Sequence, residues 1–220
     1  MSELAARAAA PIDHAVRGRF NAWFFRVFDG YIRRLTAPLK QAAFAGIEPR
    51  DVVELGPGVG ANLGFLPRGT RLLAVEPNLR MHAALLARCA AAELDVRLIA
   101  TRAEDLPLAD ASVDDILCSL VLCTVDDPDA VLREVRRVLR PGGRFRFVEH
   151  VAAAPWTPRS AVQRAVGRPW AWIFEGCDPH RDTEAAIERA GFTQVTVTRR
   201  RLRGSVFYPV NTAIFGIATR

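Results

Sequence analysis

From residue 51 onward, short apolar runs alternate with segments whose apolar residues recur three and four positions apart. The runs are typical of strands buried on both faces, and the wider spacing indicates amphipathic helices. The pattern predicts strands at residues 51–55, 71–75, 96–100, 112–122, 144–151, 192–199 and 212–219, and helices at residues 61–66, 78–91, 127–139 and within 158–191. Such alternation gives a doubly wound α/β fold with right-handed crossovers. Because no helix separates the last two strands, we expect them to pair antiparallel in a seven-stranded, mostly parallel sheet.

The segment before the first strand has helical spacing of its own. Between residues 12 and 46, apolar and aromatic side chains recur at positions 20, 24, 27 and 31 and at positions 28, 32 and 35. Because this segment precedes the alternating region, we expect it outside the core, as a helical lid across the ligand-binding edge of the sheet. We therefore divide the chain into a lid at residues 1–48 and a main domain at residues 49–220. A peripheral membrane-binding helix, favoured by Trp and Phe beside Arg, and simple packing are the alternatives.

Composition narrows the classes of function. The 220 residues carry a formal net charge of +6, but the basic residues are spread along the chain and interleaved with acids, so we expect no nucleic-acid partner. No apolar run approaches the ~20 residues of a transmembrane segment, so none is expected. The four cysteines form no C-x-x-C pair, which favours a reduced, cytoplasmic protein without a metal site.

A glycine-rich turn follows the first predicted strand. Gly56, Gly58 and Gly60 let the backbone turn sharply and leave room for a ligand, because no Cβ stands in the way. About twenty residues later, Glu76 ends the second apolar run and can accept hydrogen bonds from both hydroxyls of a ribose. A glycine turn with a distant acid is a general nucleotide-binding layout. The spacing is G-x-G-x-G rather than the dinucleotide G-x-G-x-x-G.

Glu54 indicates which nucleotide is bound. Together with the three glycines it resembles the E/D-x-G-x-G-x-G signature of class I S-adenosylmethionine-dependent methyltransferases, which have a Rossmann-like fold. The resemblance implies that Glu54 lies near the cationic methionine end of the cofactor. A carboxylate there would repel a pyrophosphate and attract an ammonium and a sulfonium, so S-adenosylmethionine is the expected cofactor rather than NAD. We expect further cofactor contacts from Asn62, Pro77 and Asn78.

Two downstream segments strengthen this resemblance. Residues 103–114 are similar to the A-E-x-L-P-F-x-x-x-S-F-D stretch of the UbiE-like branch of these methyltransferases, and residues 132–143 are similar to its L-x-E-x-x-R-V-L-K-P-G-G stretch. In that branch, the residues that match Ala103 and Glu104 lie beside the adenine, and the position of Ser119 lines the cofactor pocket. The resemblance therefore adds these three residues to the expected cofactor site.

A narrower similarity concerns the acceptor of the methyl group. Residues 60–67, 118–125, 148–153 and 174–178 resemble segments of the methyltransferase-like alkyl-thiol S-methyltransferases of the animal endoplasmic reticulum. The resemblance is strongest in the cofactor half of the chain. It suggests a thiol as the acceptor.

The acceptor is expected outside the carboxyl ends of the strands, where open α/β sheets bind their ligands. His150 ends the fifth predicted strand there and is the candidate catalytic residue, because an imidazole titrates near neutral pH and can contact or deprotonate the acceptor. Cys123, Trp23, Trp170 and Asp178 are candidates for the acceptor pocket. Structural roles, such as closing a strand end or filling the core, remain open for these residues. The His, Cys and Asp residues around position 178 match no metal-ligand spacing, so no metal is expected.

These features predict an enzyme that transfers a methyl group from S-adenosylmethionine to a small, fairly apolar acceptor, with a thiol slightly favoured. An oxygen or nitrogen acceptor on a natural product, a quinone or a phospholipid headgroup is the nearest alternative. A nucleic-acid methyltransferase and a catalytically silent cofactor-binding protein are alternatives from other classes. Peripheral membrane contact and the oligomeric state are left open.

Overall fold

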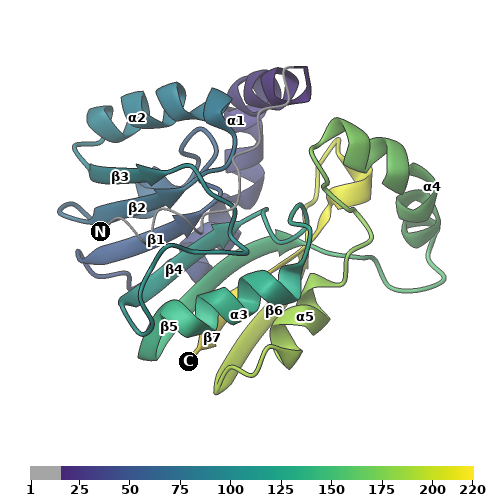
Figure 1. Ribbon diagram of the computed structural model, residues 1–220. Helices are drawn as coiled ribbons and strands as arrows, with labels where there is room; N and C mark the ends of the chain where they lie inside the picture. The colour runs from purple at the N-terminus through teal and green to yellow at the C-terminus, as the bar shows by residue number, and fades with distance from the viewer. Residues whose placement is uncertain (1–15) are drawn as a thin grey trace.

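The computed structural model describes residues 16–220 and centres on one seven-stranded sheet (Figure 1). The strands are β1 (Asp51–Leu55), β2 (Arg71–Val75), β3 (Asp95–Ile99), β4 (Val113–Ser119), β5 (Leu139–His150), β6 (Gln194–Arg201) and β7 (Thr212–Thr219). Their order in the sheet is β3-β2-β1-β4-β5-β7-β6. The pairs from β3 to β5 are parallel, and β7 lies antiparallel between β5 and β6. The predicted mostly parallel sheet is confirmed, including its antiparallel closing pair.

The parallel strands end near one another at one edge of the sheet. Leu55, the last residue of β1, pairs with Val75 at the end of β2 and with Cys118 of β4. The strand order reverses between β1 and β4, and such a switch point is where open α/β sheets bind ligands. The loops after β1, β2 and β4 therefore meet at the edge where the site is expected.

The helices are α1 (Arg17–Ala43), α2 (His82–Ala91), α3 (Pro128–Val138), α4 (Pro158–Ile173) and α5 (Thr183–Arg189), with 3₁₀ turns η2 (Leu63–Phe65), η3 (Leu79–Met81) and η4 (Tyr208–Val210). Asp127 caps α3 by accepting a hydrogen bond from Ala130 N at 3.0 Å, and Pro128 occupies the first turn. The helix predicted at residues 61–66 is wrong. Only η2 forms, because the segment is short and Pro67 follows it.

One part of helix α1 packs in the core, and another part lies at the ligand edge. Near its C-terminal end, Leu39 and Ala43 are buried in an apolar cluster with Val52 and Val148 of the sheet. This part differs from the expectation that the whole N-terminal segment stays outside the core, because a sheet face needs an apolar cover. The N-terminal part of α1 reaches the ligand edge instead. Residues 1–15 of the expected lid lie outside the described residues.

A buried ion pair joins the end of α1 to the sheet. Arg146 on β5 donates from Nε to Asp115 on β4 at 2.6 Å, and both side chains are fully buried. Nη1 of Arg146 also donates to the carbonyl oxygens of Ala43 and Ala45, at 3.1 and 2.7 Å. A buried guanidinium is tolerated only when a carboxylate and hydrogen-bond acceptors satisfy it. These contacts therefore fix the end of α1 against the two strands.

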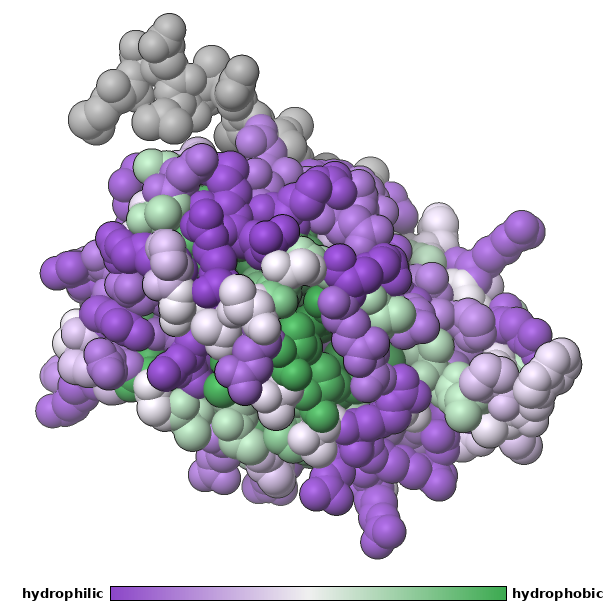
Figure 2. All heavy atoms as spheres, turned by 90° about the horizontal axis from the view of Figure 1, so that it is seen from below, coloured by the Kyte–Doolittle hydropathy of each residue, from purple (hydrophilic) through white to green (hydrophobic). Residues whose placement is uncertain are grey.

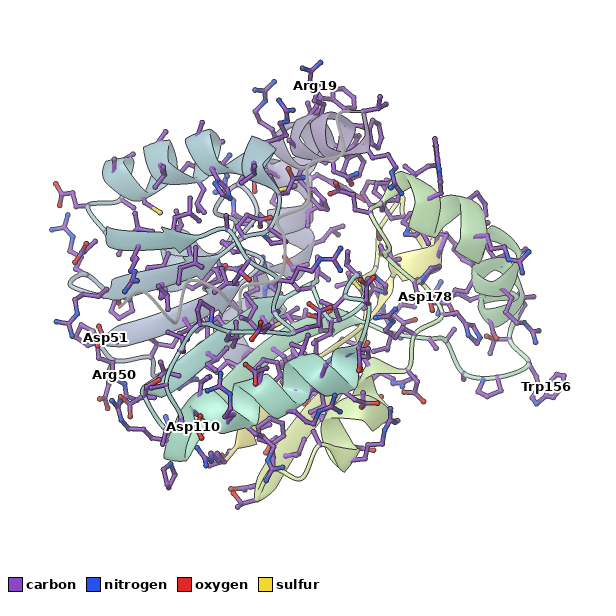
Figure 3. All side chains as sticks on the ribbon, in the orientation of Figure 1. Arg19, Arg50, Asp51, Asp110, Trp156 and Asp178 are labelled. Atoms are coloured by element: carbon purple, nitrogen blue, oxygen red, sulfur yellow. The ribbon has the colours of Figure 1, made fainter. Side chains whose placement is uncertain are left out.

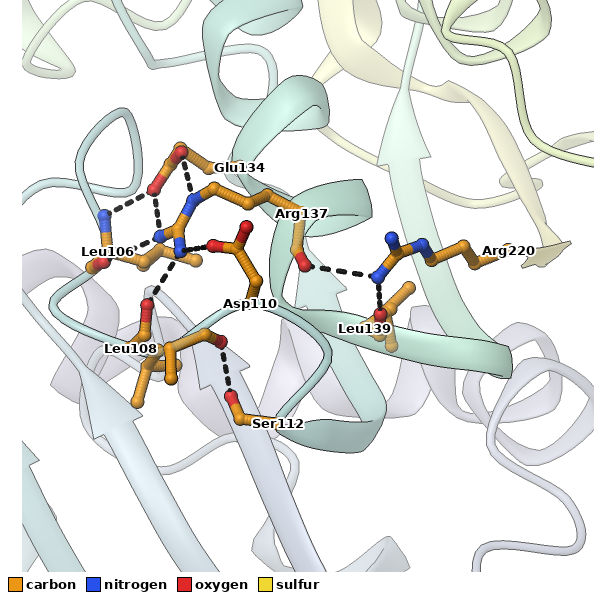
Figure 4. A network of polar contacts seen from close by, with 9 residues as sticks. Leu106, Leu108, Asp110, Ser112, Glu134, Arg137, Leu139 and Arg220 are labelled. Atoms are coloured by element: carbon orange, nitrogen blue, oxygen red, sulfur yellow. Dashed lines mark hydrogen bonds and ion pairs between the residues drawn. The ribbon is translucent and has the colours of Figure 1, made fainter.

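A second polar network fixes the segment between β3 and β4 against α3 (Figure 4). Arg137 donates to both carboxylate oxygens of Glu134 at 2.7 Å, and its guanidinium holds the pKa of that carboxyl below its usual value. Arg137 also donates to the carbonyl oxygens of Leu106 and Leu108, at 2.9 and 2.7 Å. These residues belong to the two segments that resemble the UbiE-like branch. The network sets the position of the neighbouring residues 103–104 at the ligand edge.

The face of the molecule drawn in Figure 2 is largely polar. In the view of Figure 2, hydrophilic residues cover most of the face, and apolar residues gather in a hollow near its centre. Trp156, just before α4, is 92% exposed and points away from the body of the protein in Figure 3. Within residues 16–220, no helix combines the length and the apolar character needed to cross a bilayer.

Candidate functional site

A cavity of about 460 Å³ opens at the carboxyl ends of the strands, within the ~300–1,000 Å³ range of small-molecule sites. Its wall comes from α1, from the loops after β1, β2, β3 and β4, from the end of β5, from residues 170–177 and from parts of residues 202–210. The predicted site residues in this wall are Gly56, Gly58, Asn62, Glu76, Pro77, Asn78, Ala103, Glu104, Ser119, Cys123, His150 and Trp170. The structure therefore brings most of the expected cofactor and acceptor residues to one cavity.

The glycine turn passes close to the loop after β4. Gly56 and Gly58 both have a φ of +58°, in the left-handed region that favours glycine. A Cβ on Gly56 would lie only 2.5 Å from Cγ2 of Val121, so the close approach requires glycine there. Gly60 does not line the cavity, and a Cβ there would lie 2.8 Å from Cδ1 of Leu63. Contrary to the expected cofactor contact, Gly60 lies behind the wall and lets the turn pack on η2.

Glu76 joins the glycine turn to the loop after β2. Its Oε2 accepts a hydrogen bond from Gly58 N at 2.9 Å, and its Oε1 accepts one from Asn78 N at 2.8 Å. The side chain lines the cavity although it is only 5% exposed, and burial raises its pKa to about 7. Because each carboxylate oxygen has two lone pairs, both retain acceptor capacity for a ligand.

Glu54 lies behind the cavity wall, which differs from the expected place beside a cofactor. It is fully buried, and its Oε1 accepts a hydrogen bond at 2.7 Å from Nδ2 of Asn62, which itself lines the cavity. Lys40, the only lysine of the chain, also lines the cavity and interacts with the charge of Glu54. Burial raises the pKa of Glu54 to about 7 and lowers that of Lys40 to about 8. Sequence reasoning did not identify Lys40, which lies on α1, outside every motif.

The segment after β3 and the end of β4 form the next part of the wall. Ala103 and Glu104 line the cavity, and Oε1 of Glu104 accepts a hydrogen bond from Asp126 N at 3.0 Å. Ser119 also lines the cavity, and its Oγ is buried without a hydrogen-bond partner among residues 16–220. Because buried polar groups are normally paired, this hydroxyl is available to a ligand.

Cys123, His150 and Cys177 meet in one corner of the cavity. Nε2 of His150 lies 3.1 Å from Sγ of Cys177, which lies 3.9 Å from Sγ of Cys123. Nε1 of Trp170 donates a hydrogen bond to Sγ of Cys177 at 3.3 Å. We call Cys123, His150 and Cys177 the sulfur corner. The sequence pointed to Cys123, His150 and Trp170 separately but did not assign Cys177 to the site, because the corner assembles only in the fold.

The loop that carries Cys177 is fixed against the turn that carries Cys123. Asp178 N donates to the carbonyl oxygen of Cys123 at 2.8 Å. Gly176 has a φ of +101°, and a Cβ there would lie 2.8 Å from the carbonyl oxygen of Thr124. The two segments are therefore in close backbone contact, which holds the two sulfurs near each other.

Glu149 fixes the other side of the sulfur corner. Its Oε1 accepts hydrogen bonds from Val121 N at 2.9 Å and from Leu122 N at 3.2 Å. The side chain is fully buried, and burial raises its pKa. Because Glu149 precedes His150 on β5, it links the position of the histidine to the turn after β4.

An aromatic wall covers the sulfur corner. The rings of Trp170 and Phe174 lie 4.6 Å apart between centroids, and those of Phe174 and Phe24 lie 5.0 Å apart. All three residues line the cavity, and Phe24 comes from α1. Aromatic contacts at these distances add to the free energy of burial. The corner therefore has an apolar cover, which suits an apolar acceptor.

Two predicted acceptor residues do not line the cavity. Trp23 is 49% exposed on α1 and packs against Phe20, with ring centroids 5.9 Å apart. Asp178 lies between the sheet and α4 in Figure 3, and its Oδ1 accepts a hydrogen bond from His180 N at 2.8 Å. Helical spacing did not distinguish the inward Phe24 from the neighbouring Trp23. Asp178 shapes the loop rather than the cavity surface.

Known proteins share this fold and domain. Residues 53–147 match a family model described as a methyltransferase domain. An S-adenosylmethionine-dependent methyltransferase of Thermotoga maritima, titled a possible histamine N-methyltransferase, aligns with a TM-score of 0.65 and 20% identity over 92% of this chain and 97% of its own. Geranyl diphosphate methyltransferase, solved in complex with SAM, aligns with a TM-score of 0.68 and 16% identity over 97% and 96%. Residues 53–147 are therefore similar to a methyltransferase domain, and the chain has the class I methyltransferase fold, as predicted.

Proteins that are similar in sequence include two thiol S-methyltransferases and a C-methyltransferase. Thiol S-methyltransferase TMT1A of Homo sapiens is 38% identical over 156 residues, which are 69% of this chain and 64% of that protein. Thiol S-methyltransferase TMT1B of Mus musculus is 40% identical over 66% of this chain and 60% of its own length. The ubiquinone/menaquinone biosynthesis C-methyltransferase UbiE of Rubrivivax gelatinosus is 38% identical over 49% of this chain and 42% of its own. The chain thus spans 60 to 64% of the two thiol relatives, and the predicted resemblance to both groups is confirmed.

Proposed function

We propose that this chain is an S-adenosylmethionine-dependent methyltransferase that acts on a small, fairly apolar thiol. The observation that carries the proposal is a single cavity that joins a glycine turn and Glu76 to the sulfur corner under its aromatic wall. The similarity to thiol S-methyltransferases supports a thiol over the oxygen, nitrogen and nucleic-acid acceptors left open by the sequence.

The cofactor occupies the polar end of the cavity in this proposal. Glu76 accepts hydrogen bonds from the two ribose hydroxyls. Ala103, Glu104 and Ser119 lie beside the adenine. Lys40 pairs with the methionine carboxylate. The two buried carboxyls, Glu54 and Glu76, attract the sulfonium and disfavour a pyrophosphate when ionised. Pro77 and Asn78 complete the wall beside the ribose.

The reaction is an in-line displacement at the methyl group. A lone pair on the acceptor sulfur forms the new S–C bond, and the C–S bond of the sulfonium breaks with its electron pair going to the cofactor sulfur. The products are a methyl thioether and S-adenosylhomocysteine, and the thiol proton passes to water before or during the attack. Because the leaving group is good and a thiolate is a strong nucleophile, positioning is the main task of the protein.

The acceptor lies at the sulfur corner in this proposal. His150 is assigned as the catalytic residue that contacts the acceptor sulfur, since its ring lines the cavity beside Cys123. The aromatic wall supplies the apolar contact area. The N-terminal part of α1 covers the same region, which supports a lid within residues 1–48 over a catalytic domain at residues 49–220. A cytoplasmic location stays a prediction, supported by four free cysteines.

A screen with methyl-labelled S-adenosylmethionine tests the proposal. Matched acceptors, such as benzyl mercaptan, benzyl alcohol and benzylamine, share one apolar group and differ in the attacking atom. The proposal predicts label in benzyl methyl sulfide and little or none in the ether or the N-methylamine. Methylation of the alcohol or amine alone would contradict the thiol assignment, and no labelled product from any thiol would contradict the proposed activity.

A further inference from the structure

We propose that Cys123, His150 and Cys177 bind one zinc ion whose fourth coordination position takes the sulfur of the acceptor. The inference rests on the proposed thiol substrate for the role of the fourth position, but the metal site itself stands on the sulfur corner alone. It departs from the sequence-based expectation of no metal. Cys123 and Cys177 are 54 residues apart, and His150 is 27 residues from Cys177, so no local spacing in the sequence indicates the site.

The separations of the ligand atoms are close to those that a zinc ion requires. The two Sγ atoms and a ring nitrogen of His150 all lie within 4.8 Å of one another, and the Sγ–Sγ distance is 3.9 Å. Zn–S bonds of ~2.3 Å at a tetrahedral angle place two sulfurs about 3.8 Å apart. The Nε2–Sγ distance of 3.1 Å widens by about half an ångström to reach tetrahedral geometry, which a small side-chain rotation provides.

Polar groups of the surroundings lie within hydrogen-bond distance of both cysteine sulfurs. Nε1 of Trp170 donates to Sγ of Cys177 at 3.3 Å, and the hydroxyl of Thr124 lies 3.5 Å from Sγ of Cys123. Such outer hydrogen bonds orient metal ligands and stabilise their charge. The backbone bond from Asp178 N to the carbonyl oxygen of Cys123 holds the two ligand-bearing segments together before any metal binds. The site is therefore preorganised.

Charge also selects the ion. Two thiolates and a neutral imidazole carry two negative charges, which a divalent zinc ion cancels. A neutral cluster suits this corner, because Cys123 and His150 are 1% and 4% exposed and uncompensated charge is costly there. Thiolate and imidazole ligands favour zinc over magnesium or calcium.

Three protein ligands leave one position of a tetrahedral ion open, as in catalytic zinc sites. All three ligands line the cavity, so the fourth position faces the space assigned to the acceptor. A thiol that binds there releases its proton to water and reaches the sulfonium as a thiolate. The methyl transfer then follows the same displacement, and the thioether leaves because it is a weaker ligand than a thiolate.

Metal analysis of the full chain tests the site. We expect about one zinc per chain in protein purified without chelators, and the same value in Cys89→Ala, which removes a buried cysteine outside the cavity. Cys123→Ser and Cys177→Ser should each retain less than about a fifth of the zinc. Circular dichroism of each variant checks folding. Equal zinc in the wild type and in folded Cys123→Ser and Cys177→Ser would overturn the site.

Cobalt substitution supplies a readout that needs no activity and no variant. Wild-type protein stripped of metal and titrated with Co²⁺ should show a sulfur-to-cobalt charge-transfer band at one equivalent. Benzyl mercaptan added without cofactor should change that band, whereas benzyl alcohol should not. A titration without a charge-transfer band would overturn the metal site.

Metal content and methyl transfer separate this inference from the proposed function. Stripped protein that methylates benzyl mercaptan at the full rate would overturn the metal's role and leave the methyltransferase assignment intact. Stoichiometric metal that takes up benzyl mercaptan, without methylation of any thiol, would support the site and contradict the proposed function.

Discussion

The two ends of the cavity are built in different ways. At the cofactor end, Gly56, Gly58 and Glu76 lie within 21 residues of one another and are joined directly by the hydrogen bond from Gly58 N to Glu76. At the acceptor end, Cys123 and Cys177 come from segments 54 residues apart and meet only through the loop after α4. The glycine turn and Glu76 at the first end belong to one strand-turn-strand unit, whereas the second end depends on the tertiary fold.

This difference predicts that substitutions at the two ends have different effects. The glycine turn holds a shape that all ligands of the same class require, and its backbone is constrained by positive φ angles. The sulfur corner is held by a loop and covered by α1 and α4, so its surface can vary without disturbing the sheet. We therefore expect substitutions at the first end to abolish cofactor binding, and those at the second to affect mainly transfer to the acceptor.

The largest effect is expected at Gly58. In Gly58→Val, a β-branched residue is forced into a φ of +58° and its side chain enters the cavity, so S-adenosylmethionine binding should fall by more than about 100-fold. Gly142→Val is the matched control, because Gly142 has a φ of +79°, open space around its Cβ and no place in the cavity wall. Calorimetry should show normal affinity in the control. Equal losses in both variants would mean that backbone strain, not the site, is responsible.

Glu76→Ala should also remove most cofactor affinity. The change deletes the acceptor for two ribose hydroxyls and the bond to Gly58 N, and two hydrogen bonds to a charged group account for a loss of about 100-fold. Glu76→Gln keeps the size and one acceptor, so its loss should be smaller. Unchanged affinity in both Glu76→Ala and Gly58→Val would refute the cofactor assignment.

His150→Ala should separate turnover of the acceptor from cofactor affinity most clearly. The imidazole lies beside Sγ of Cys177 in the sulfur corner, so turnover of a thiol should fall by about 100-fold while cofactor affinity changes less than about two-fold. His180→Ala is the control and should keep full turnover, because His180 is exposed in the loop between α4 and α5 that also carries Cys177. Unimpaired turnover in His150→Ala would remove this residue from the mechanism.

The smallest effect concerns pH at the cofactor end. Burial raises the pKa of Glu76 to about 7 in the free protein, and the cofactor binds its ionised form, so affinity should rise about ten-fold between pH 6 and pH 8. Glu76→Gln should flatten that rise. The folding stability of the free protein depends on pH with the opposite sign. A raised folded-state pKa contributes stability that is present below pH 4.5 and is lost as the pH rises through about 7. A pH-independent affinity in the wild type would contradict the assignment of Glu76.

The same contrast explains what could be predicted from the sequence. Buried apolar runs predicted every strand of the sheet, and the apolar spacing within residues 127–139 predicted α3, because these signals act over a few residues. The glycine turn and Glu76 were predicted for the same reason. The residues missed or misplaced depend on distant neighbours. Lys40 reaches the cavity only through the packing of α1, and Cys177 only through its loop.

Burial depth is the other quantity that sequence did not supply. Glu54 belongs to the predicted motif, yet it lies behind the cavity wall and accepts a hydrogen bond from Asn62. Trp23 and Phe24 are adjacent in a helix, and only Phe24 faces the cavity. Both outcomes are set by the angle at which neighbouring elements pack, which a periodic pattern does not encode.

A crystal structure of the protein with S-adenosylhomocysteine bound tests the central claim most directly. The account predicts ribose hydroxyls within hydrogen-bond distance of Glu76, the adenine beside Ala103 and Glu104, and the thioether sulfur directed toward Cys123, His150 and Cys177. An empty cavity at saturating ligand, or a ligand sulfur directed away from the sulfur corner, would contradict it.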